Sequence, residues 1–218
     1  MSTNHARHNP TLVITGTSRG IGHHLALRFL AEGYDVIGIS RTETKLAHPG
    51  FLSVAADIGD LGQVENLSGV LAGRSIRGLI NNAGIHGPLG AFDTAPMKEW
   101  VRAFQVNLFG GAALAQLCAP AIRRDKGFII FLSGGGSAYP RPNFSAYGVS
   151  KTAVVRLSEV LAKEFAPDIL VYCVAPGPNR TQLLEEVIRS GEAVPEGDIV
   201  DFGYVERLCL FLARNKDP

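Results

Sequence analysis

The chain has 218 residues, of which 46% are hydrophobic and 19% charged, and its formal net charge is +1. This composition excludes a disordered chain and predicts a folded protein of about one large domain. It gives no support to a nucleic-acid or anionic-membrane partner, and no apolar run approaches the roughly 20 residues of a membrane span.

The chain begins with a polar stretch, 1–10, that lacks the apolar centre of a signal peptide, so we expect a short N-terminal tail there. Strand-like and helix-like segments then alternate. The expected strands are 11–16, 34–40, 51–57, 76–84, 127–133 and 168–177. The expected helices are 21–33, 61–73, 97–124, 145–166, a short one near 181–190, and 202–214.

The expected strands are continuous apolar runs, which is typical of a sheet covered by helices on both faces. Their alternation with helices predicts βαβ units and therefore a parallel, doubly wound α/β sheet, the Rossmann fold, in a single domain over 11–218. In such a sheet, ligands bind beyond the carboxyl ends of the strands. The functional residues are therefore expected at those ends.

A glycine-rich turn follows the first expected strand and opens the next helix. Such a turn lets a diphosphate approach the backbone N–H groups and the positive end of the helix dipole. A turn without a ligand is the alternative, but the position at the start of a βαβ unit favours nucleotide binding. The residues expected to form this site are Gly16, Ser18, Arg19, Gly20, Ile21 and Gly22.

The end of the second expected strand bears on the choice between NAD(H) and NADP(H). An acidic residue there would bind the 2′-hydroxyl of the adenine ribose, but this chain has Ser40 and Arg41. Serine and arginine can bind a 2′-phosphate, and Arg19 adds a second cation nearby. This pattern favours NADP(H), unless both arginines are simply solvated loop residues.

With these motifs the chain resembles the classical short-chain dehydrogenase/reductase (SDR) family, from about residue 10 to 214. The matching motifs are T-G-x-x-x-G-x-G at 15–22, N-N-A-G at 81–84, Y-x-x-x-K at 147–151 and P-G-x-x-x-T at 176–181. The resemblance implies that Asp57 contacts adenine through its side chain. It further implies that the cofactor site includes Ile58, Asn82, Ala83, Gly84, Tyr147, Lys151, Pro176, Gly177 and Thr181.

The resemblance also implies hydride transfer between a nicotinamide and a carbonyl or alcohol carbon. Tyr147 is the expected general acid/base, although the free pKa of tyrosine is about 10. Lys151 lies one helical turn away on the same face, where its charge would stabilise the phenolate and its amine would bind the nicotinamide ribose. Asn107 matches the asparagine that completes a water-linked proton relay.

The serine that holds the substrate oxygen in this family usually lies 13 residues before the tyrosine, and here that position is Gly134. Ser133, one residue earlier, is the expected substitute, with Ser137 as the alternative. If neither serves, backbone donors or Tyr147 alone would stabilise the substrate oxygen.

The chain departs from the family at its C-terminal end, because the expected final strand is missing after the helix 202–214. We therefore expect a homodimer or homotetramer formed through the helices 97–124 and 145–166. The small residues Gly110, Gly111, Ala112 and Ala113 would suit close helix packing in that interface.

The loop 178–201 is expected to act as lid and substrate wall, with its apolar residues in core or lid packing. Tyr139, Arg141, Phe144 and His86 are further candidates for the pocket, although a loop histidine such as His86 is more often solvated than catalytic. Trp100 is expected in the core. Two other functions stay open, namely an SDR-like nucleotide-binding sensor and a dehydratase or epimerase on the same fold.

Three cysteines, Cys118, Cys173 and Cys209, are far apart and form neither a metal-binding spacing nor a C-x-x-C motif. Free, buried thiols are typical of a reducing compartment. We therefore expect reduced cysteines, no metal site and a cytoplasmic protein.

Overall fold

A computed structural model describes residues 9–192 and 194–215, so most of the expected tail 1–10 lies outside the described residues. The described residues form one six-stranded sheet with the order β3-β2-β1-β4-β5-β6. Every neighbouring pair is parallel. The strands are β1 Thr11–Thr15, β2 Asp35–Ser40, β3 Phe51–Ala55, β4 Ile76–Asn81, β5 Phe128–Leu132 and β6 Leu170–Val174. The predicted parallel, doubly wound α/β sheet is confirmed.

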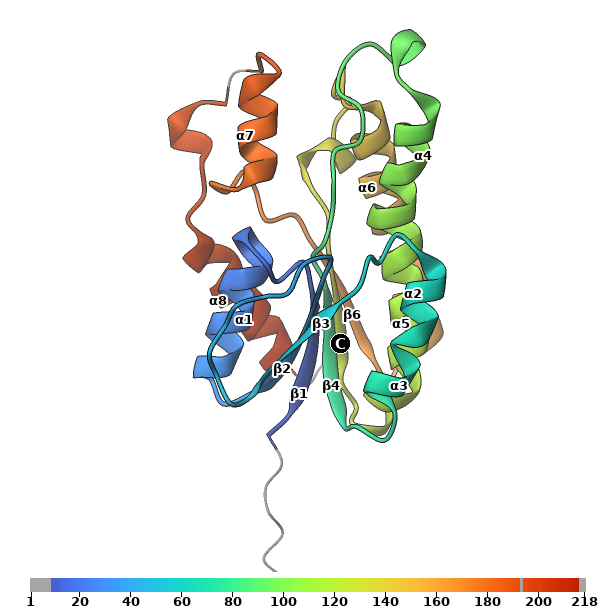
Figure 1. Ribbon diagram of the computed structural model, residues 1–218, viewed down its shortest axis with the longest axis vertical. Helices are drawn as coiled ribbons and strands as arrows, with labels where there is room; N and C mark the ends of the chain where they lie inside the picture. The colour runs from blue at the N-terminus through green and yellow to red at the C-terminus, as the bar shows by residue number, and fades with distance from the viewer. Residues whose placement is uncertain (1–8, 193, 216–218) are drawn as a thin grey trace, which may run out of the picture.

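Helices cover both faces of this sheet (Figure 1). On one face lie α1 Gly20–Ala31 and α8 Phe202–Arg214, which pack on each other. The other face carries α2 Leu61–Asn66, α3 Ser68–Leu71, α4 Met97–Phe104, α5 Gly110–Arg124 and α6 Ser145–Phe165. Alternate strand residues therefore enter two separate apolar cores, for example Leu12 and Ile14 in one and Val13 in the other.

The expected helix 97–124 is divided into three segments. A π-helical turn, η2 Gln105–Phe109, lies between α4 and α5 and contains Asn107. The extra residue in such a turn rotates the following residues around the helix axis, and π-turns frequently occur at functional sites. The expected helix 61–73 is likewise divided into α2 and α3.

The glycines at the start of α5 have a different role from the predicted one. A Cβ on Gly110 would lie 2.1 Å from the backbone oxygen of Ile58. Gly111 is also buried, and its carbonyl accepts a hydrogen bond of 3.2 Å from the amide of Asn81. Both glycines thus let α5 pack against its own chain, so they are not available for close contact with a partner.

The carboxyl ends of the strands meet at one edge of the sheet, beneath α7 Gln182–Arg189 (Figure 1). Helix α7 begins at Thr181, whose hydroxyl accepts a hydrogen bond from the N–H of Leu184. The described part of the chain has no strand after β6. Within it, no helix is both long and apolar enough to span a bilayer.

Candidate active site

The glycine turn between β1 and α1 has the backbone geometry of a ligand-binding loop. Gly16 and Gly20 have φ angles of +75° and +57°, a region that glycine enters without steric cost. A Cβ on Gly22 would lie 2.3 Å from the carbonyl oxygen of Gly16, so this position also requires glycine. Arg19 precedes α1 without a side-chain cap, and no acidic residue lies in the first turn. The first N–H groups of α1 are therefore available to an anion.

Asn82 and Ala83 connect this turn to the end of β4. The Asn82 side-chain amide donates to the carbonyl oxygen of Thr15 at 2.8 Å, and the N–H groups of Asn82 and Ala83 donate to the Thr15 hydroxyl at 3.0 and 2.9 Å. These bonds hold the two neighbouring strand ends together. Thr181, more than 150 residues further along the chain, also reaches the turn, because a Cβ on Gly20 would lie 3.1 Å from its methyl group.

The residues expected at the adenine end of a cofactor lie at the carboxyl ends of β2 and β3. Arg41 is exposed, whereas the hydroxyl of Ser40 is buried and donates to the carbonyl oxygen of Thr42 at 2.7 Å. Ser40 therefore uses its hydroxyl inside the chain. Ser18 and Arg19 are exposed in the glycine turn, and Ile21 is half-buried behind them.

Asp57 has partners of its own at the end of β3. Its carboxylate accepts a hydrogen bond from the Gly59 N–H at 2.9 Å and forms an ion pair with Arg102 of α4. Burial raises the pKa of Asp57, but these bonds and the nearby charge of Arg41 outweigh burial and leave the pKa below its usual value. The adjacent Ile58 is buried under α5.

Lys151 and Asn107 lie together at the carboxyl ends of β4 and β5. The Lys151 amine donates to the carbonyl oxygen of Leu132 at 2.7 Å, and only 4% of Lys151 is exposed. A Cβ on Gly84 would lie 3.3 Å from both the Lys151 amine and the Asn107 side-chain oxygen. Burial lowers the pKa of Lys151 to about 8. A buried amine that titrates near neutrality is typical of a functional lysine.

The Tyr147 ring lies beside this group, with the Lys151 amine 5.9 Å from its centre. Burial raises the pKa of Tyr147, and Arg141 is the cation that opposes this rise. The structure thus differs from the expected depression by Lys151, whose amine is directed to the Leu132 carbonyl instead.

Asn107 acts as a clamp on the loop after β4. Its side-chain oxygen accepts from the Ile85 N–H at 2.8 Å, and its amide donates to the Ile85 carbonyl at 2.9 Å and to the Ser150 hydroxyl at 2.8 Å. Both the oxygen and the amide group of the Asn107 side chain therefore have hydrogen-bond partners, as a buried amide requires. The π-turn η2 supplies the orientation that these bonds need.

Gly134, and not Ser133, is the residue whose side-chain position meets the Tyr147 hydroxyl. A Cβ on Gly134 would lie 2.3 Å from that oxygen. The Ser133 hydroxyl lies 2.9 Å from the Ser137 hydroxyl and 3.3 Å from the Lys151 carbonyl oxygen. Ser137 in turn donates to the Gly134 carbonyl at 2.8 Å. Both serines therefore make bonds within the loop and α6.

His86 lies beside Tyr147, where a candidate pocket residue is expected, but it is buried and not solvated. Only 6% of it is exposed, and its ring packs edge-on against the rings of Tyr147 and Phe144, with centroid distances of 4.9 and 5.9 Å. Its Nδ1 lies 3.2 Å from a carboxylate oxygen of Glu186 on α7. It is a buried neighbour of Tyr147, in contrast to the solvated loop histidine that its glycine-rich context indicates.

The substrate loop 178–201 contributes both packing and charge. Leu184 and Val187 of α7 are buried, as lid or core packing requires, whereas Ile188 is 53% exposed. Pro176 is buried and the neighbouring Gly177 has a φ of +73°, which turns the chain from β6 into this loop. Arg141, which stacks 4.0 Å from the Phe144 ring centre, also pairs with Glu192 at 3.8 Å.

The other predicted pocket residues differ in accessibility. Tyr139 is 72% exposed and lines a hollow of about 290 Å³ together with Arg141 and Phe144. Trp100, which the sequence predicts in the core, is only half-buried; it stacks on Phe104 and donates to the Ser145 hydroxyl at 3.2 Å.

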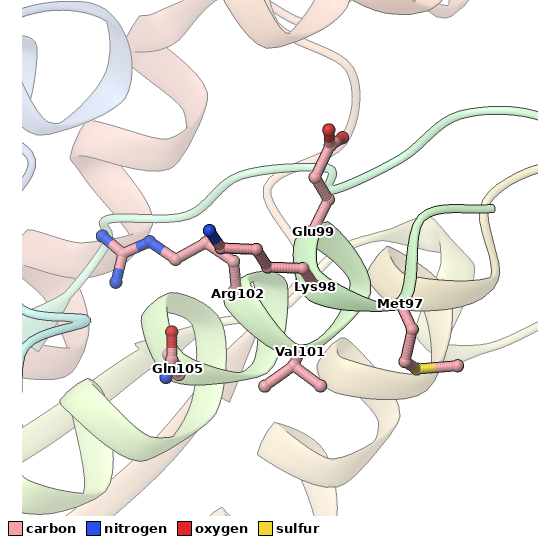
Figure 2. A pocket seen from close by; sticks show the side chains of 6 residues that line it. All are labelled: Met97, Lys98, Glu99, Val101, Arg102 and Gln105. Carbon is pink, nitrogen blue, oxygen red and sulfur yellow. The ribbon is translucent and has the colours of Figure 1, made fainter.

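A larger hollow, of about 580 Å³, lies along α4 (Figure 2). Figure 2 shows that the labelled side chains all come from this one helix and its continuation into η2. They are Met97, Lys98, Glu99, Val101, Arg102 and Gln105. The hollow includes neither the glycine turn nor Tyr147, but its Arg102 is the partner of Asp57.

Comparison with known proteins identifies the class of protein that this fold and site define. The model of the short chain dehydrogenase family matches residues 10–191. The chain therefore belongs to the short-chain dehydrogenase/reductase family, a family of oxidoreductases.

Individual relatives are similar over most of this chain. The benzil reductase ((S)-benzoin forming) IRC24 of Saccharomyces cerevisiae is 31% identical over 81% of this chain and 74% of its own length. The 11-beta-hydroxysteroid dehydrogenase A of Sesamum indicum is 30% identical over 87% of this chain and 58% of its own length. The chain thus spans less than two thirds of the sesame relative.

Solved structures of relatives have the same fold. The 3-ketoacyl-(acyl-carrier-protein) reductase of Brucella melitensis, complexed with NADH, has a TM-score of 0.84 at 26% identity, over 95% of this chain and 91% of that one. ElxO with NADP bound has a TM-score of 0.83 at 26% identity, over 95% and 92%.

Proposed function

We propose that the protein is an NADP(H)-dependent oxidoreductase that interconverts a carbonyl and a secondary alcohol, with Tyr147 as general acid/base. The observation that carries the proposal is the position of Tyr147. Its ring lies beside the buried amine of Lys151, at the same sheet edge as the glycine turn. Relatives that are named as reductases and dehydrogenases support the same reaction class.

The residues present fit a dinucleotide. Gly22 leaves no room for a side chain above the turn, and the start of α1 has free N–H groups without a competing acidic residue. Gly16, Gly20, Asn82, Ala83 and Thr181 would line this cradle, with Gly84, Pro176 and Gly177 toward the Tyr147 side. A bound nicotinamide supplies or accepts the hydride in this family's reaction.

Tyr147 carries the proton in this mechanism. In reduction its hydroxyl donates a hydrogen bond to the carbonyl oxygen and then gives up its proton as negative charge develops there. In oxidation the phenolate accepts the proton of the alcohol. Burial raises the pKa of Tyr147, so the protonated form, which reduction requires, dominates at neutral pH.

Lys151 and Asn107 support this proton transfer. The buried Lys151 amine would bind the nicotinamide ribose, whereas Arg141 is the cation that stabilises the phenolate in this geometry. Asn107 fixes the loop that faces Tyr147 through its bonds to Ile85. Because the Ser133 hydroxyl is bonded toward Lys151 and Ser137, we propose that Tyr147 alone, the alternative to the predicted Ser133, holds the substrate oxygen.

NADP(H) is favoured over NAD(H) because the edge beside the glycine turn carries cations. Arg41 is exposed at the end of β2, and Arg19 is exposed in the turn, so both can reach a 2′-phosphate. Asp57, the acidic residue at the end of the neighbouring strand β3, is already paired with Arg102. The solved structures of two relatives contain different cofactors, NADP in ElxO and NADH in the ketoacyl reductase.

We also propose that the protein works in the cytoplasm and assembles into a homodimer or homotetramer through the helical region 97–124 and α6. The free thiols Cys118, Cys173 and Cys209 suit a reducing compartment. Exposed apolar side chains on those helices support the assembly.

The proposal is tested by Tyr147→Phe, which keeps the aromatic ring and removes the hydroxyl group that donates the proton. We expect this variant to lose about 10³-fold or more in kcat for NADPH-dependent ketone reduction, because the general acid is gone. NADPH binding, followed by fluorescence quenching, is expected to stay within about threefold of the wild-type protein. Full activity in this variant would refute the assigned mechanism.

A further inference from the structure

His86 is a polar side chain placed beside the reacting group but assigned no part in the reaction above. It lies in the loop after β4, with its ring 4.9 Å from that of Tyr147 and only 6% of the residue exposed. Burying an imidazole costs free energy unless its nitrogens find partners. One nitrogen has such a partner, since Nδ1 lies 3.2 Å from Glu186.

The bond to Glu186 determines which ring nitrogen carries the hydrogen. A carboxylate oxygen only accepts hydrogen bonds, so Nδ1 is the protonated nitrogen and Nε2 keeps its lone pair in the neutral ring. Among residues 9–192 and 194–215, no hydrogen-bond partner of Nε2 is found. The site therefore contains one unused hydrogen-bond acceptor close to Tyr147.

The position of His86 is tightly held on both sides. Asn107 clamps the backbone of the preceding residue, Ile85, with two hydrogen bonds. The following residue, Gly87, has a φ of +73°, and a Cβ there would lie 2.9 Å from the Ala103 methyl and 3.1 Å from that of Ala146. An acceptor held in this way is preorganised for binding a ligand.

Tyr147 and His86 therefore offer complementary groups to a substrate, a donor for the carbonyl oxygen and an acceptor for a neighbouring hydroxyl. Gly134 adds no third polar group at the Tyr147 hydroxyl. We propose that His86, oriented by Glu186, binds a hydroxyl group on the carbon next to the reacting carbonyl. The preferred substrates are then α-hydroxy ketones and the vicinal diols that their reduction gives, an inference that rests on the proposed carbonyl reduction.

The acceptor is present at neutral pH. Burial lowers the pKa of His86 below 6.5, the bond and the charge of Glu186 oppose this, and the charges of Arg141 and Lys151 lower it further. These groups, with Tyr147, are the titratable and charged neighbours that face His86 from α7, α6 and the loop before α6. Protonation at lower pH places a hydrogen on Nε2 and removes the acceptor.

The test compares two ketones in NADPH-dependent reduction at pH 7.5. 2-Hydroxyacetophenone has the hydroxyl, whereas 2-methoxyacetophenone has a similar inductive effect but no hydroxyl hydrogen. We expect the wild-type protein to prefer the hydroxy ketone in kcat/KM by about 10- to 100-fold, because the methoxy ketone leaves the acceptor of His86 without its hydrogen bond. His86→Phe is expected to reduce this ratio to about 1 to 3, and His86→Gln, which retains an acceptor oxygen, to restore part of it.

Glu186→Gln and Glu185→Gln form a matched pair on α7. Glu186→Gln is expected to lower the ratio severalfold, chiefly through a higher KM for the hydroxy ketone, because Nδ1 loses its carboxylate. Glu185 pairs instead with Arg189 on the exposed side of the helix, so Glu185→Gln is expected to leave the ratio unchanged. An equal fall in activity on both ketones in His86→Phe would overturn the hydroxyl site and leave the carbonyl reduction standing.

A binding measurement separates this inference from the proposed function. In protein labelled with ¹⁵N-histidine, 2-hydroxyacetophenone is expected to shift the Nε2 resonance of His86, and 2-methoxyacetophenone is expected to shift it much less. The result decides the inference even if the protein reduces neither ketone, an outcome that would refute the proposed reaction alone. Equal shifts, or no shift with either ketone, would refute the hydroxyl site.

Discussion

The residue next to the Tyr147 hydroxyl is Gly134, where a serine is usual in the family that the chain resembles. The space that a serine side chain would occupy is already filled by the tyrosine oxygen, 2.3 Å from the Cβ position. Real Cβ atoms do not approach an oxygen so closely, so a side chain at this position requires Tyr147 to move. The loss of the serine and the position of Tyr147 are therefore coupled.

A pair of single substitutions distinguishes the two neighbouring positions. Gly134→Ser is expected to lower kcat about 10- to 100-fold, because the new side chain displaces the Tyr147 hydroxyl from its place. Ser133→Ala is expected to cost only about 1 kcal/mol in unfolding free energy, from the lost bond toward Lys151, and to keep kcat within about tenfold. Steady-state kinetics and urea unfolding measure these effects.

The opposite results would indicate the family's usual arrangement, in which a serine holds the substrate oxygen. A gain of activity in Gly134→Ser would mean that Tyr147 accommodates the added hydroxyl and uses it. A loss of about 10³-fold in Ser133→Ala would identify Ser133 as the group that holds the substrate oxygen.

At the scale of elements, the site depends on how helices and strand ends are shaped. The π-turn η2 lets Asn107 reach the Ile85 backbone, and thereby places His86 beside Tyr147. The glycine turn leads from β1 into α1, and the Asn82 side chain joins the end of β1 to the end of β4 by its bond to Thr15. Each of these elements positions a residue on another element, so local sequence alone does not describe the result.

The residues at the carboxyl ends of β2 and β3 lead to a separate prediction about the cofactor. NADPH is expected to raise the melting temperature more than NADH at equal concentration, because Arg41 pairs with the 2′-phosphate. Arg41→Ala is expected to weaken NADPH binding about 10-fold or more and to leave NADH binding nearly unchanged. Thermal shift and fluorescence titration measure both.

A control for this edge is Arg102→Ala, which removes the partner of Asp57 on α4. This variant is expected to weaken the binding of NADPH and of NADH to a similar extent, because the unpaired carboxylate of Asp57 repels the phosphates of either cofactor. Equal or stronger binding of NADH by the wild-type protein would contradict the preference for NADP(H).

At the scale of the whole molecule, apolar side chains remain exposed on the helical layer that includes α4, η2 and α6. They are Met97, Val101, Phe109, Val149 and Val160, with exposed fractions between 43% and 56%. We expect these side chains to form the apolar part of the predicted interface between copies of the chain. The prediction of assembly through these helices thus stands on their apolar residues, whereas Gly110 and Gly111 face the core of their own chain.

The assembly prediction is tested by Phe109→Glu, with Phe211→Glu on α8 as the control on the opposite face of the sheet. The wild-type protein is expected to have at least twice its chain mass of 23.3 kDa in light scattering. Phe109→Glu is expected to shift it toward the monomer, because a buried unpaired charge opposes association. Phe211, 65% exposed, is expected to tolerate the same change without an effect on mass. A monomeric wild-type protein would contradict the prediction.

The sequence by itself determined the architecture and the position of the candidate site. Continuous apolar strands alternating with helices require a parallel sheet covered on both faces, and the strand order β3-β2-β1-β4-β5-β6 agrees with that expectation. The motifs are short and local, so the glycine turn could be located from its spacing, and the end of β4 and the pair Tyr147–Lys151 from their resemblance to the family's motifs. Because the carboxyl ends of parallel strands share one edge, the sequence also predicted that these motifs meet.

Only the tertiary structure decided how the side chains at that edge are used. Ser133 and Ser40 carry the hydroxyls that sequence reasoning assigned to ligands, but packing directs both to partners within the chain. His86 has no local signal for burial, since its partners Phe144, Tyr147 and Glu186 are all distant in the sequence. The direction of a side chain depends on contacts between elements, whereas periodicity and spacing report only the element to which a residue belongs.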